Sequence, residues 1–316
     1  MANTWRSWSD DRYAQMTIAI TGSGGQLGSG LLRLLGSAAL GLDLPEFDLT
    51  DRPRVLSALR ALRPRAIVNT AAYTRVDEAE TAGEHCRAIN SAGVAQLAEA
   101  CRELDCVLVQ ISTDYVFGGD AARRRPYRED EEPCPQGVYA RSKRDGERQA
   151  GAWSKHFIVR TCGLYGQPGP RSGSNFVATM LRLAEHGQPL RVVADQCCTP
   201  SYVPHVARAI GFLRTTEAYG IYHVTNLGAT TWHGLAVEIF RQAGLDVTVE
   251  PITTAQYRAR AQRPAYSVLD TSKYHSLPGR PEMPTWQEAL REYLVASCQL
   301  SVANDRPEPA APGPLP

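Results

Sequence analysis

The sequence predicts an α/β protein with a doubly wound parallel sheet and a smaller C-terminal lobe. In the first half of the chain, short apolar runs alternate with amphipathic stretches long enough to form helices. The short runs are apolar at nearly every position, which is typical of parallel strands covered by helices on both faces. In the second half the alternation becomes less regular, which indicates that part of the chain lies outside the main sheet.

Strands and helices follow one another in β-α order up to residue 161. Strands are predicted at 17–20, 39–44, 66–70, 106–111 and 156–160. The helices between them are predicted at 27–35, 55–62, 88–102 and 138–150. Parallel strands joined by such helices form right-handed crossovers in a single sheet. We therefore expect residues 16–161 to form the sheet domain.

Residues 162–298 are predicted to form the smaller lobe, with a few of its strands joining the main sheet. Helices are expected there at 174–186, 203–214, 232–243 and 286–296, and strands at 191–193 and 221–224. Both ends of the chain should be flexible. Residues 1–15 are polar and precede Met16, an alternative start of translation, and the tail 299–316 contains five prolines.

Composition excludes several classes of function. A formal net charge of +1 disfavours a general nucleic-acid partner. No run approaches the roughly 18 apolar residues of a membrane helix, and the first fifteen residues lack the apolar core of a signal peptide. The eight cysteines include no C-x-x-C pair, so we expect free thiols and no metal site. These features predict a cytoplasmic protein that binds neither nucleic acid nor membrane.

A glycine-rich turn directly follows the first predicted strand. It reads TGSGGQLG over residues 21–28, with Gly22, Gly25 and Gly28 at three-residue spacing. Glycines at these positions let backbone N–H groups approach a pyrophosphate at the start of the next helix. The turn predicts a dinucleotide-binding Rossmann domain, with cofactor contacts at Gly22, Gly25, Gln26, Leu27 and Gly28.

The end of the second strand should carry the adenosine-binding residues. Asp43 could bind the ribose 2′-hydroxyl and repel a 2′-phosphate. Its spacing from Gly28 is short, so Asp48 and Leu49 are an alternative place for adenine contacts. No arginine directly follows this strand, which favours NADH, but the choice between NADPH and NADH stays open.

Tyr139 and Lys143 form a Y-x-x-x-K pair in the predicted helix 138–150. Side chains four residues apart lie on the same helix face, so the ammonium can lower the pKa of the phenol. Such a pair suits protonation of a carbonyl oxygen during reduction. Lysine occurs at only three positions of this chain, so about 0.1 such pairs would be expected by chance.

Hydroxyl and carboxyl groups follow the fourth strand. Ser112, Thr113 and Asp114 lie there, and ligands bind a doubly wound sheet at the carboxyl ends of its strands. A hydroxyl at this place could hydrogen-bond the carbonyl of a substrate.

Together these segments resemble the extended short-chain dehydrogenase/reductase superfamily and, within it, the dTDP-4-dehydrorhamnose reductase family. The resemblance extends from Met16 to about residue 296. Besides the glycine turn, the matching stretches are IVNTAAYTRVDEAE (67–80), ISTDYVFGG (111–119), VYARSKRDGE (138–147), IVRTCGLYG (158–166), NFVATMLRLA (175–184), DQCCTPSY (195–202) and RPAYSVLD (263–270).

The resemblance implies a role for particular residues. Thr113, Tyr139 and Lys143 would be catalytic, with Tyr139 as general acid, and Tyr139 and Lys143 would also contact the cofactor. Ala71, Ala72 and Tyr73 would contact the cofactor through their backbone. The substrate-binding residues would be Thr113, Asp114, Asn175, Phe176, Asp195, Gln196 and Arg263. Arg263 suits a diphosphate, although a solvated surface arginine is the alternative.

The implied reaction is NAD(P)H-dependent reduction of the C4 keto group of a dTDP-6-deoxy-4-hexulose, giving dTDP-L-rhamnose from dTDP-4-dehydrorhamnose. Two departures from the family bear on it. Gly163 stands where the family usually has a tryptophan, which favours a different sugar. Ser29 and Gly30 stand where some members carry a magnesium-binding glutamate, so we expect a monomer, or a homodimer without bridging magnesium. Reduction of another nucleotide deoxysugar and a non-catalytic, nucleotide-binding regulatory subunit remain alternatives.

Overall fold

The computed structural model describes residues 18–187 and 190–304, and a six-stranded parallel sheet forms the centre of this part of the chain. The strand order is β10-β5-β4-β3-β1-β2. The bounds are β1 Ile18–Thr21, β2 Ala39–Leu42, β3 Ala66–Asn69, β4 Val107–Thr113, β5 His156–Thr161 and β10 Gly220–His223. The comparisons below and this sheet confirm the predicted doubly wound α/β fold.

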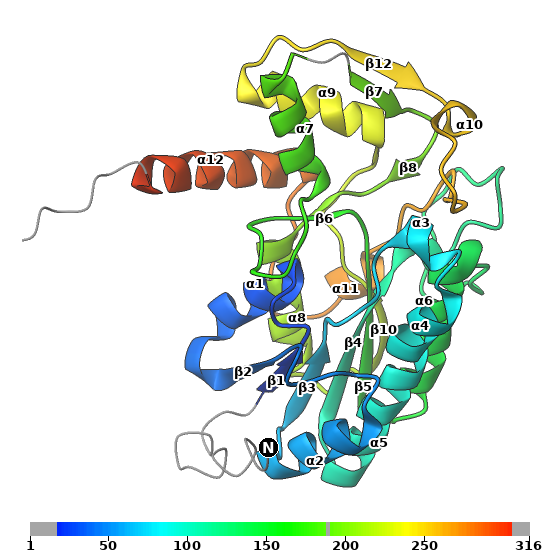
Figure 1. The fold of residues 1–316 in the computed structure, drawn as a ribbon, viewed down its shortest axis with the longest axis vertical. Helices are drawn as coiled ribbons and strands as arrows, with labels where there is room; N and C mark the ends of the chain where they lie inside the picture. Colours follow the sequence, from blue (N-terminus) through cyan, green and yellow to red (C-terminus); the bar gives the residue numbers. More distant parts are fainter. Residues whose placement is uncertain (1–17, 188–189, 305–316) are drawn as a thin grey trace, which may run out of the picture.

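Helices cover both faces of the sheet (Figure 1). One face carries α1 (Gln26–Leu35) and α8 (Val203–Leu213). The other face carries α2 (Arg52–Leu62), α5 (Gly93–Leu104) and α6 (Gly137–Gly151). This two-sided cover explains why the central strands are apolar at nearly every position.

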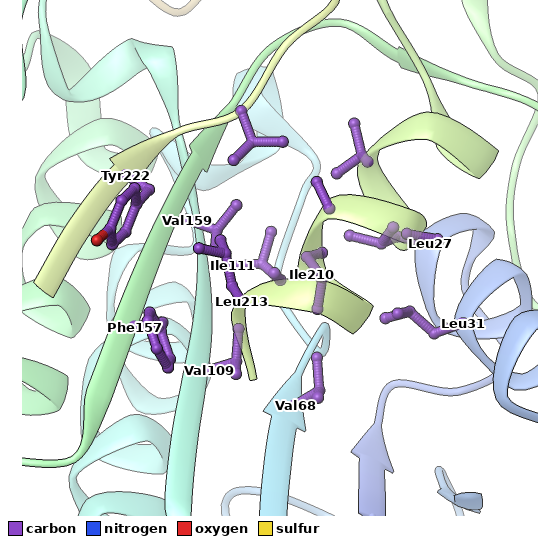
Figure 2. Packing of buried hydrophobic residues seen from close by; sticks show 14 of the residues in the cluster. Leu27, Leu31, Val68, Val109, Ile111, Phe157, Val159, Ile210, Leu213 and Tyr222 are labelled. Carbon is purple, nitrogen blue, oxygen red and sulfur yellow. The ribbon is translucent and has the colours of Figure 1, made fainter. Parts of the chain in front are cut away.

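Neighbouring residues of each strand contribute to different cores, because side chains of a strand alternate between its faces. Figure 2 shows Val68 of β3, Val109 of β4 and Val159 of β5 in one cluster with Leu27 and Leu31 of α1 and Ile210 and Leu213 of α8. Ile67, Leu108 and Ile158 pack on the opposite face. Each such side chain, fully removed from water, contributes about 1.5–3 kcal/mol to stability.

The helix predicted at 88–102 has a more complex beginning than its sequence pattern suggested. It starts as α4 (Gly83–Arg87), passes through a π-helical turn (Ala88–Ala92) and continues as α5. Two short helices, α3 (Val76–Ala79) and the 3-10 turn Asp114–Val116, follow β3 and β4 respectively. The π turn holds the buried Asn90 beside α6, where its side chain bonds Ser142.

The segment predicted as the smaller lobe divides between two places. Its α8 and β10 belong to the central sheet layer, while the remainder packs around a separate core at the end toward which the sheet strands point (Figure 1). That remainder contains β6 Leu164–Tyr165, α7 Phe176–Glu185, β7 Leu190–Val193, β8 Cys197–Cys198, β9 Ser201–Tyr202, β11 Thr230–Thr231, α9 Trp232–Ala243, β12 Val249–Ile252, α10 Thr254–Tyr257 and α12 Trp286–Asn304. A further short helix, α11 (Ser272–His275), lies near β10.

The last helix extends beyond the boundary predicted for it. α12 continues to Asn304, past residue 298, because the prolines that would stop a helix begin only at Pro307. The predicted N-terminal extension, Met16 and residues 305–316 lie outside the described residues. Within the described ranges, no helix has both the length and the apolar character needed to cross a membrane.

Candidate active site

A cleft of about 610 Å³ opens where the parallel strands end. Every strand from β1 to β5 contributes residues to it at or just after its carboxyl end, as a doubly wound sheet requires. Its lining includes Gly22, Gly25, Gln26, Leu27, Gly28, Asp43, Asp48, Leu49, Ala71, Ala72, Thr113, Asp114, Tyr139 and Lys143. The structure thus brings together residues from five separate predicted segments.

The glycine turn is tight because its glycines leave no room for side chains. Gly22 has φ +65°, and a Cβ there would lie 2.5 Å from the backbone N of Ala71. A Cβ on Gly28 would lie 2.4 Å from the carbonyl oxygen of Gly22. The turn therefore holds the start of α1 directly against the end of β3.

The start of α1 presents unshielded backbone to the cleft. Its N-cap residue, Gly25, provides no side chain to accept the first amide hydrogens. Those N–H groups have no partner within the helix, and together with the helix dipole they favour an anion. Gln26, Leu27 and Gly28 all line the cleft, so this turn fits the pyrophosphate of a dinucleotide.

Asp43 fastens the glycine turn to the end of β2. Its carboxylate accepts the N–H of Gly24 at 2.5 Å and the N–H of Leu44 at 2.8 Å. Asp48 lies at the same end of the cleft and accepts two hydrogen bonds from Thr50 at 2.8 Å. Both alternatives for adenosine contacts, Asp43 and the pair Asp48 and Leu49, therefore line the cleft.

Tyr139 and Lys143 project from α6 toward the end of β4. The Lys143 ammonium donates to the carbonyl of Ile111 at 2.7 Å. Burial lowers the pKa of Lys143 to about 8, although the nearby Glu147 carboxylate acts against this shift. Burial raises the pKa of Tyr139, and a hydrogen bond with Thr113 acts in the opposite direction. At neutral pH the phenol therefore keeps its proton, ready to give it to an acceptor in the cleft.

Asp114 joins the carboxyl end of β4 to a segment far along the chain. Its buried carboxyl accepts the Ser267 hydroxyl at 2.6 Å and the Thr113 hydroxyl at 3.1 Å. Burial raises the pKa of Asp114, while its hydrogen bonds with Ser267 and other neighbours oppose that rise. The carboxyl orients Thr113, and it ties the segment 263–270 to the edge of the cleft.

A buried ion pair fixes α6 against the sheet below Lys143. Glu147 accepts two bonds from the Arg160 guanidinium, at 2.8 and 2.9 Å, and one from the Ser112 hydroxyl at 2.7 Å. Because Arg160 holds Glu147, the carboxylate one turn along α6 does not bind Lys143. The Lys143 ammonium is left pointing to the Ile111 carbonyl at the cleft wall.

The remaining predicted substrate residues lie outside the cleft lining, and their polar groups bond to the protein. Asn175 caps α7, with its side chain bonded to Ala178 N–H at 2.9 Å and to the Gly166 carbonyl at 3.0 Å. Asp195 accepts the Thr254 N–H and hydroxyl, and Gln196 donates to that hydroxyl at 3.0 Å. The structure does not bring these three side chains together with Tyr139.

Arg263, Phe176 and Tyr73 are likewise outside the lining. The Arg263 guanidinium forms two hydrogen bonds with Asp77, at 3.1 and 2.7 Å. The Tyr73 backbone, expected to contact the cofactor, donates to and accepts from the Asn90 side chain instead. The ring of Phe176 packs on Trp232, with centroids 4.9 Å apart.

An aromatic ring from elsewhere occupies the space beside Gly163. A Cβ on Gly163 would lie 3.5 Å from the tip of the Trp232 ring and 3.3 Å from Cα of Pro200. Gly163 also has φ +51°, a conformation that side chains disfavour. The positive φ and the close approach of the Pro200 backbone favour glycine at residue 163, while the Trp232 ring, at the start of α9, would meet a Cβ there at an ordinary contact distance.

Sequence reasoning missed one side of the cleft completely. The loop between β6 and α7 contributes Arg171, Ser172, Gly173 and Ser174 to the lining. The only signal in the sequence was the glycine- and proline-rich run QPGPRSGS, which predicts a loop and nothing about where it docks. Other unpredicted lining residues are Leu44, Phe47, Thr70, Thr74, Ile89, Thr161, Cys162 and Leu164.

Comparison with known proteins identifies the family. The model of the RmlD substrate binding domain matches residues 16–298. The chain is 41% identical over 297 residues to the dTDP-4-dehydrorhamnose reductase of Streptomyces griseus, covering 90% of this chain and 95% of that protein. It is 42% identical to a Streptomyces antibioticus protein named "Probable dTDP-4,6-dihydroxy-2-methyloxan-3-one 4-ketoreductase", covering 88% of this chain and 94% of that one.

A solved structure agrees with these relatives. The dTDP-4-dehydrorhamnose reductase of Bacillus anthracis strain Ames, crystallised with NADP, superposes with a TM-score of 0.84 at 38% identity. The match covers 88% of this chain and 98% of that one. The glycine turn, the Tyr139 and Lys143 pair and the late segments were thus a correct guide, and the chain belongs to the dTDP-4-dehydrorhamnose reductase family.

Proposed function

We propose that this chain reduces the C4 ketone of a dTDP-6-deoxy-4-hexulose, converting dTDP-4-dehydrorhamnose to dTDP-L-rhamnose, with Tyr139 as the proton donor. The observation that carries this proposal is the half-buried, protonated Tyr139 beside Thr113, in the same cleft as the glycine turn. The activity of the Streptomyces griseus and Bacillus anthracis relatives, given by their names, supports it.

The chain is an oxidoreductase that uses NADPH or NADH. The start of α1 holds the pyrophosphate, while Asp43, Asp48 and Leu49 lie where the adenosine half would bind. Lys143 and the backbone of Ala71 and Ala72 line the way toward Tyr139. When bound, the reduced nicotinamide supplies the hydride for the ketone carbon.

Three side chains take part in the proton transfer, namely Thr113, Tyr139 and Lys143. In the described structure the Thr113 hydroxyl donates to Asp114, and on substrate binding it would turn this hydrogen to the ketone oxygen and position that oxygen next to Tyr139. Tyr139 donates its proton to that oxygen, which becomes the hydroxyl of the product. The Lys143 ammonium, four residues along the same helix face, stabilises the phenolate that remains. Exchange with water through the cleft then restores the phenol.

The nucleotide end of the substrate is proposed to lie toward Arg263. Its guanidinium is held in a fixed orientation by Asp77, and the N–H groups of Nε and Nη2 that Asp77 does not use would donate to the oxygens of a diphosphate. In this proposal the shape of the lobe around the nucleotide end of the substrate is set by Asn175, Phe176, Asp195 and Gln196. Their own polar groups hold α7 and α10 in place.

A second candidate is the same reduction on another dTDP-deoxysugar. Gly163 favours it, because this glycine lines the cleft at the position where the family usually has a tryptophan. The relative from Streptomyces antibioticus is named as a 4-ketoreductase of a different dTDP sugar. A non-catalytic regulatory subunit is the third alternative, but it gives no reason to retain the arrangement of Thr113, Tyr139 and Lys143.

One assay separates these candidates. The purified protein is mixed with dTDP-4-dehydrorhamnose or with another dTDP-4-keto-6-deoxyhexose, and oxidation of NADPH and of NADH is followed by absorbance. Fast turnover of dTDP-4-dehydrorhamnose supports the first candidate, and faster turnover of the other sugar supports the second. Tight cofactor binding without turnover of any keto sugar would leave only the regulatory subunit.

A further inference from the structure

An arginine reaches the end of β2 from a distant part of the chain. The guanidinium of Arg171 donates from Nη1 to the carbonyl of Leu44 at 3.3 Å. Its Nε lies 3.8 Å from Oδ1 of Asp43. Asp43, Leu44 and Arg171 all line the cleft. An acid and an arginine therefore lie side by side where the adenosine ribose of a dinucleotide is expected in this type of sheet.

The loop that carries Arg171 is firmly docked on the glycine turn. The backbone N–H of Arg171 donates to the Gly24 carbonyl at 2.9 Å. A Cβ on Gly169 would lie 2.4 Å from that oxygen and 2.5 Å from the Gly25 carbonyl, so only glycine allows this approach. The Ser172 hydroxyl accepts the Gly169 N–H at 2.7 Å and stiffens the loop. The position of Arg171 is thus set by the same turn that binds the cofactor.

The side chain of Arg171 keeps donors for a ligand. Its Cγ and Cδ atoms cross above Gly24, 2.9 Å from where a Cβ of that residue would lie. A guanidinium carries five N–H groups, and the contacts with Leu44 and Asp43 use only Nη1 and Nε. The described residues provide no hydrogen-bond partner for Nη2, and half of the side chain is exposed, at 50%.

Asp43, by contrast, is occupied with the backbone. Its two oxygens already accept the N–H groups of Gly24 and Leu44. Its contact with Arg171, at 3.8 Å, is longer than a hydrogen bond. Arg171 can therefore turn toward a nearby anion without breaking a short bond to Asp43.

We propose that Arg171 is the specificity-determining residue that admits the 2′-phosphate of NADPH, while Asp43 serves the 2′-hydroxyl of NADH. This proposal rests on the cofactor assignment of the proposed function but not on its sugar. An acid alone at this place repels a 2′-phosphate, whereas an adjacent guanidinium binds phosphate oxygens with its planar fork. The pair would let one cleft accept both cofactors, and Arg171 would set the preference for NADPH.

The experiment measures cofactor affinity without any sugar, by titration calorimetry of the full chain with NADPH and with NADH. For Arg171→Met, which keeps the apolar stem over Gly24, we expect NADPH affinity to fall about 10- to 100-fold. NADH affinity should change less than about twofold, since the 2′-hydroxyl needs no cation. Adenosine 2′,5′-bisphosphate should lose affinity like NADPH, and 5′-AMP should behave like NADH.

A matched control separates this contact from the general loss of a positive charge. Arg191 is 54% exposed and pairs with Glu250 at 3.3 Å, far along the chain on β7 and outside the cleft lining. Arg191→Met should leave both affinities unchanged. The reverse change, Asp43→Asn, keeps an acceptor for the Gly24 N–H and should raise the preference for NADPH, because it removes the repulsive charge.

Two results would overturn the proposal. Equal losses for NADPH and NADH in Arg171→Met would place the guanidinium at the pyrophosphate that both cofactors share. Unchanged binding of both would show that Arg171 is a surface residue only. If the unaltered protein bound neither cofactor, the dinucleotide assignment itself would fail, an outcome distinct from a wrong sugar.

Discussion

The two sides of the cleft differ in how the protein uses its polar groups. On the sheet side, residues of the glycine turn, β4 and α6 place backbone N–H groups, a phenol and an ammonium at the cleft wall. On the lobe side, Asn175, Asp195 and Gln196 have their polar atoms bonded to the protein itself. The polar groups of the sheet side thus lie at the cleft wall, whereas those of the lobe side serve as a structural frame that holds the lobe together.

This difference follows from what each side has to recognise. In the proposed function the cofactor lies against a rigid arrangement of strand ends, which parallel hydrogen bonding fixes in register. The lobe is made of short strands, helices and loops, and its polar side chains serve first to cap and join those elements. Variants on each side can test whether the division is real, beginning with the sheet side, where the largest effect is expected.

Removal of the Tyr139 hydroxyl should have the largest effect on catalysis. We expect Tyr139→Phe to lower kcat by about 10²- to 10⁴-fold, because the proton donor is lost. Cofactor affinity, measured by calorimetry, should change little. Tyr165→Phe is the control, since it deletes the hydroxyl of a buried tyrosine away from the cleft lining. A rate in Tyr139→Phe close to that of the control would mean that another group supplies the proton.

The glycine turn should tolerate no side chain. Gly22→Ala combines a positive φ with a Cβ placed 2.5 Å from Ala71, and we expect a loss of more than about 2 kcal/mol in unfolding free energy. Gly244 has a similar φ, +69°, but nothing lies within 4 Å of its Cβ position. Gly244→Ala should therefore cost only about 1 kcal/mol. Urea unfolding measures both, and equal losses would show that conformation alone, without close packing, governs the turn.

Lys143 should make activity and stability respond to pH in opposite directions. Its pKa is lowered by burial to about 8, from 10.5 in the unfolded chain. Above pH 8 the ammonium loses its proton and no longer supports the phenolate, so kcat/KM should fall. Between pH 8 and 10.5 the unfolded chain binds more protons than the folded one, so the contribution of Lys143 to stability should rise with pH.

The control for this prediction is a lysine outside the cleft. Lys155 is paired with Asp105 at 2.7 Å near the start of β5, and Lys155→Met should leave the pH profile of kcat/KM unchanged. Lys143→Met should remove the rise in stability over the same range, measured by urea unfolding. A kcat/KM that stays constant up to pH 10 would show that Lys143 keeps its charge in the folded protein.

Sequence patterns predicted the sheet side well because their causes are local. A turn that excludes Cβ atoms requires glycine at Gly22 and Gly28, and two side chains that share a helix face must be about four residues apart. The strands could be recognised because each is covered on both faces. Each of these requirements can therefore be recognised in a short stretch of sequence.

The rest of the site depends on contacts between distant segments. Arg171 reaches Leu44 across more than a hundred residues, through a loop whose sequence shows only that it is a loop. The Trp232 ring beside Gly163 comes from the start of α9. The resemblance assigned Asn175 and Asp195 to the sugar-nucleotide pocket, but whether their polar groups are free or bonded depends on neighbours such as Gly166 and Thr254.

The smallest effect is expected on the lobe side, where Asn175 tests the division directly. As the cap of α7, Asn175→Ala should lower the unfolding free energy by about 1 kcal/mol. Thr231 caps α9 in the same way, bonding the Gly234 N–H at 3.0 Å, and Thr231→Ala should cost a similar amount.

Asn175 differs from Thr231 in also donating to the Gly166 carbonyl and in being assigned by the family resemblance to the sugar-nucleotide pocket. If Asn175 belongs to the frame, both variants should keep KM for the sugar nucleotide within about threefold of the original, because the cap acts on α7 and not on the ligand. A tenfold rise in KM for Asn175→Ala alone, at equal stability, would show that its amide leaves the Gly166 carbonyl to bind substrate. Polar groups of the lobe side would then contact the substrate, as we propose for the sheet side. The difference between the two sides would apply only to the protein without bound ligands.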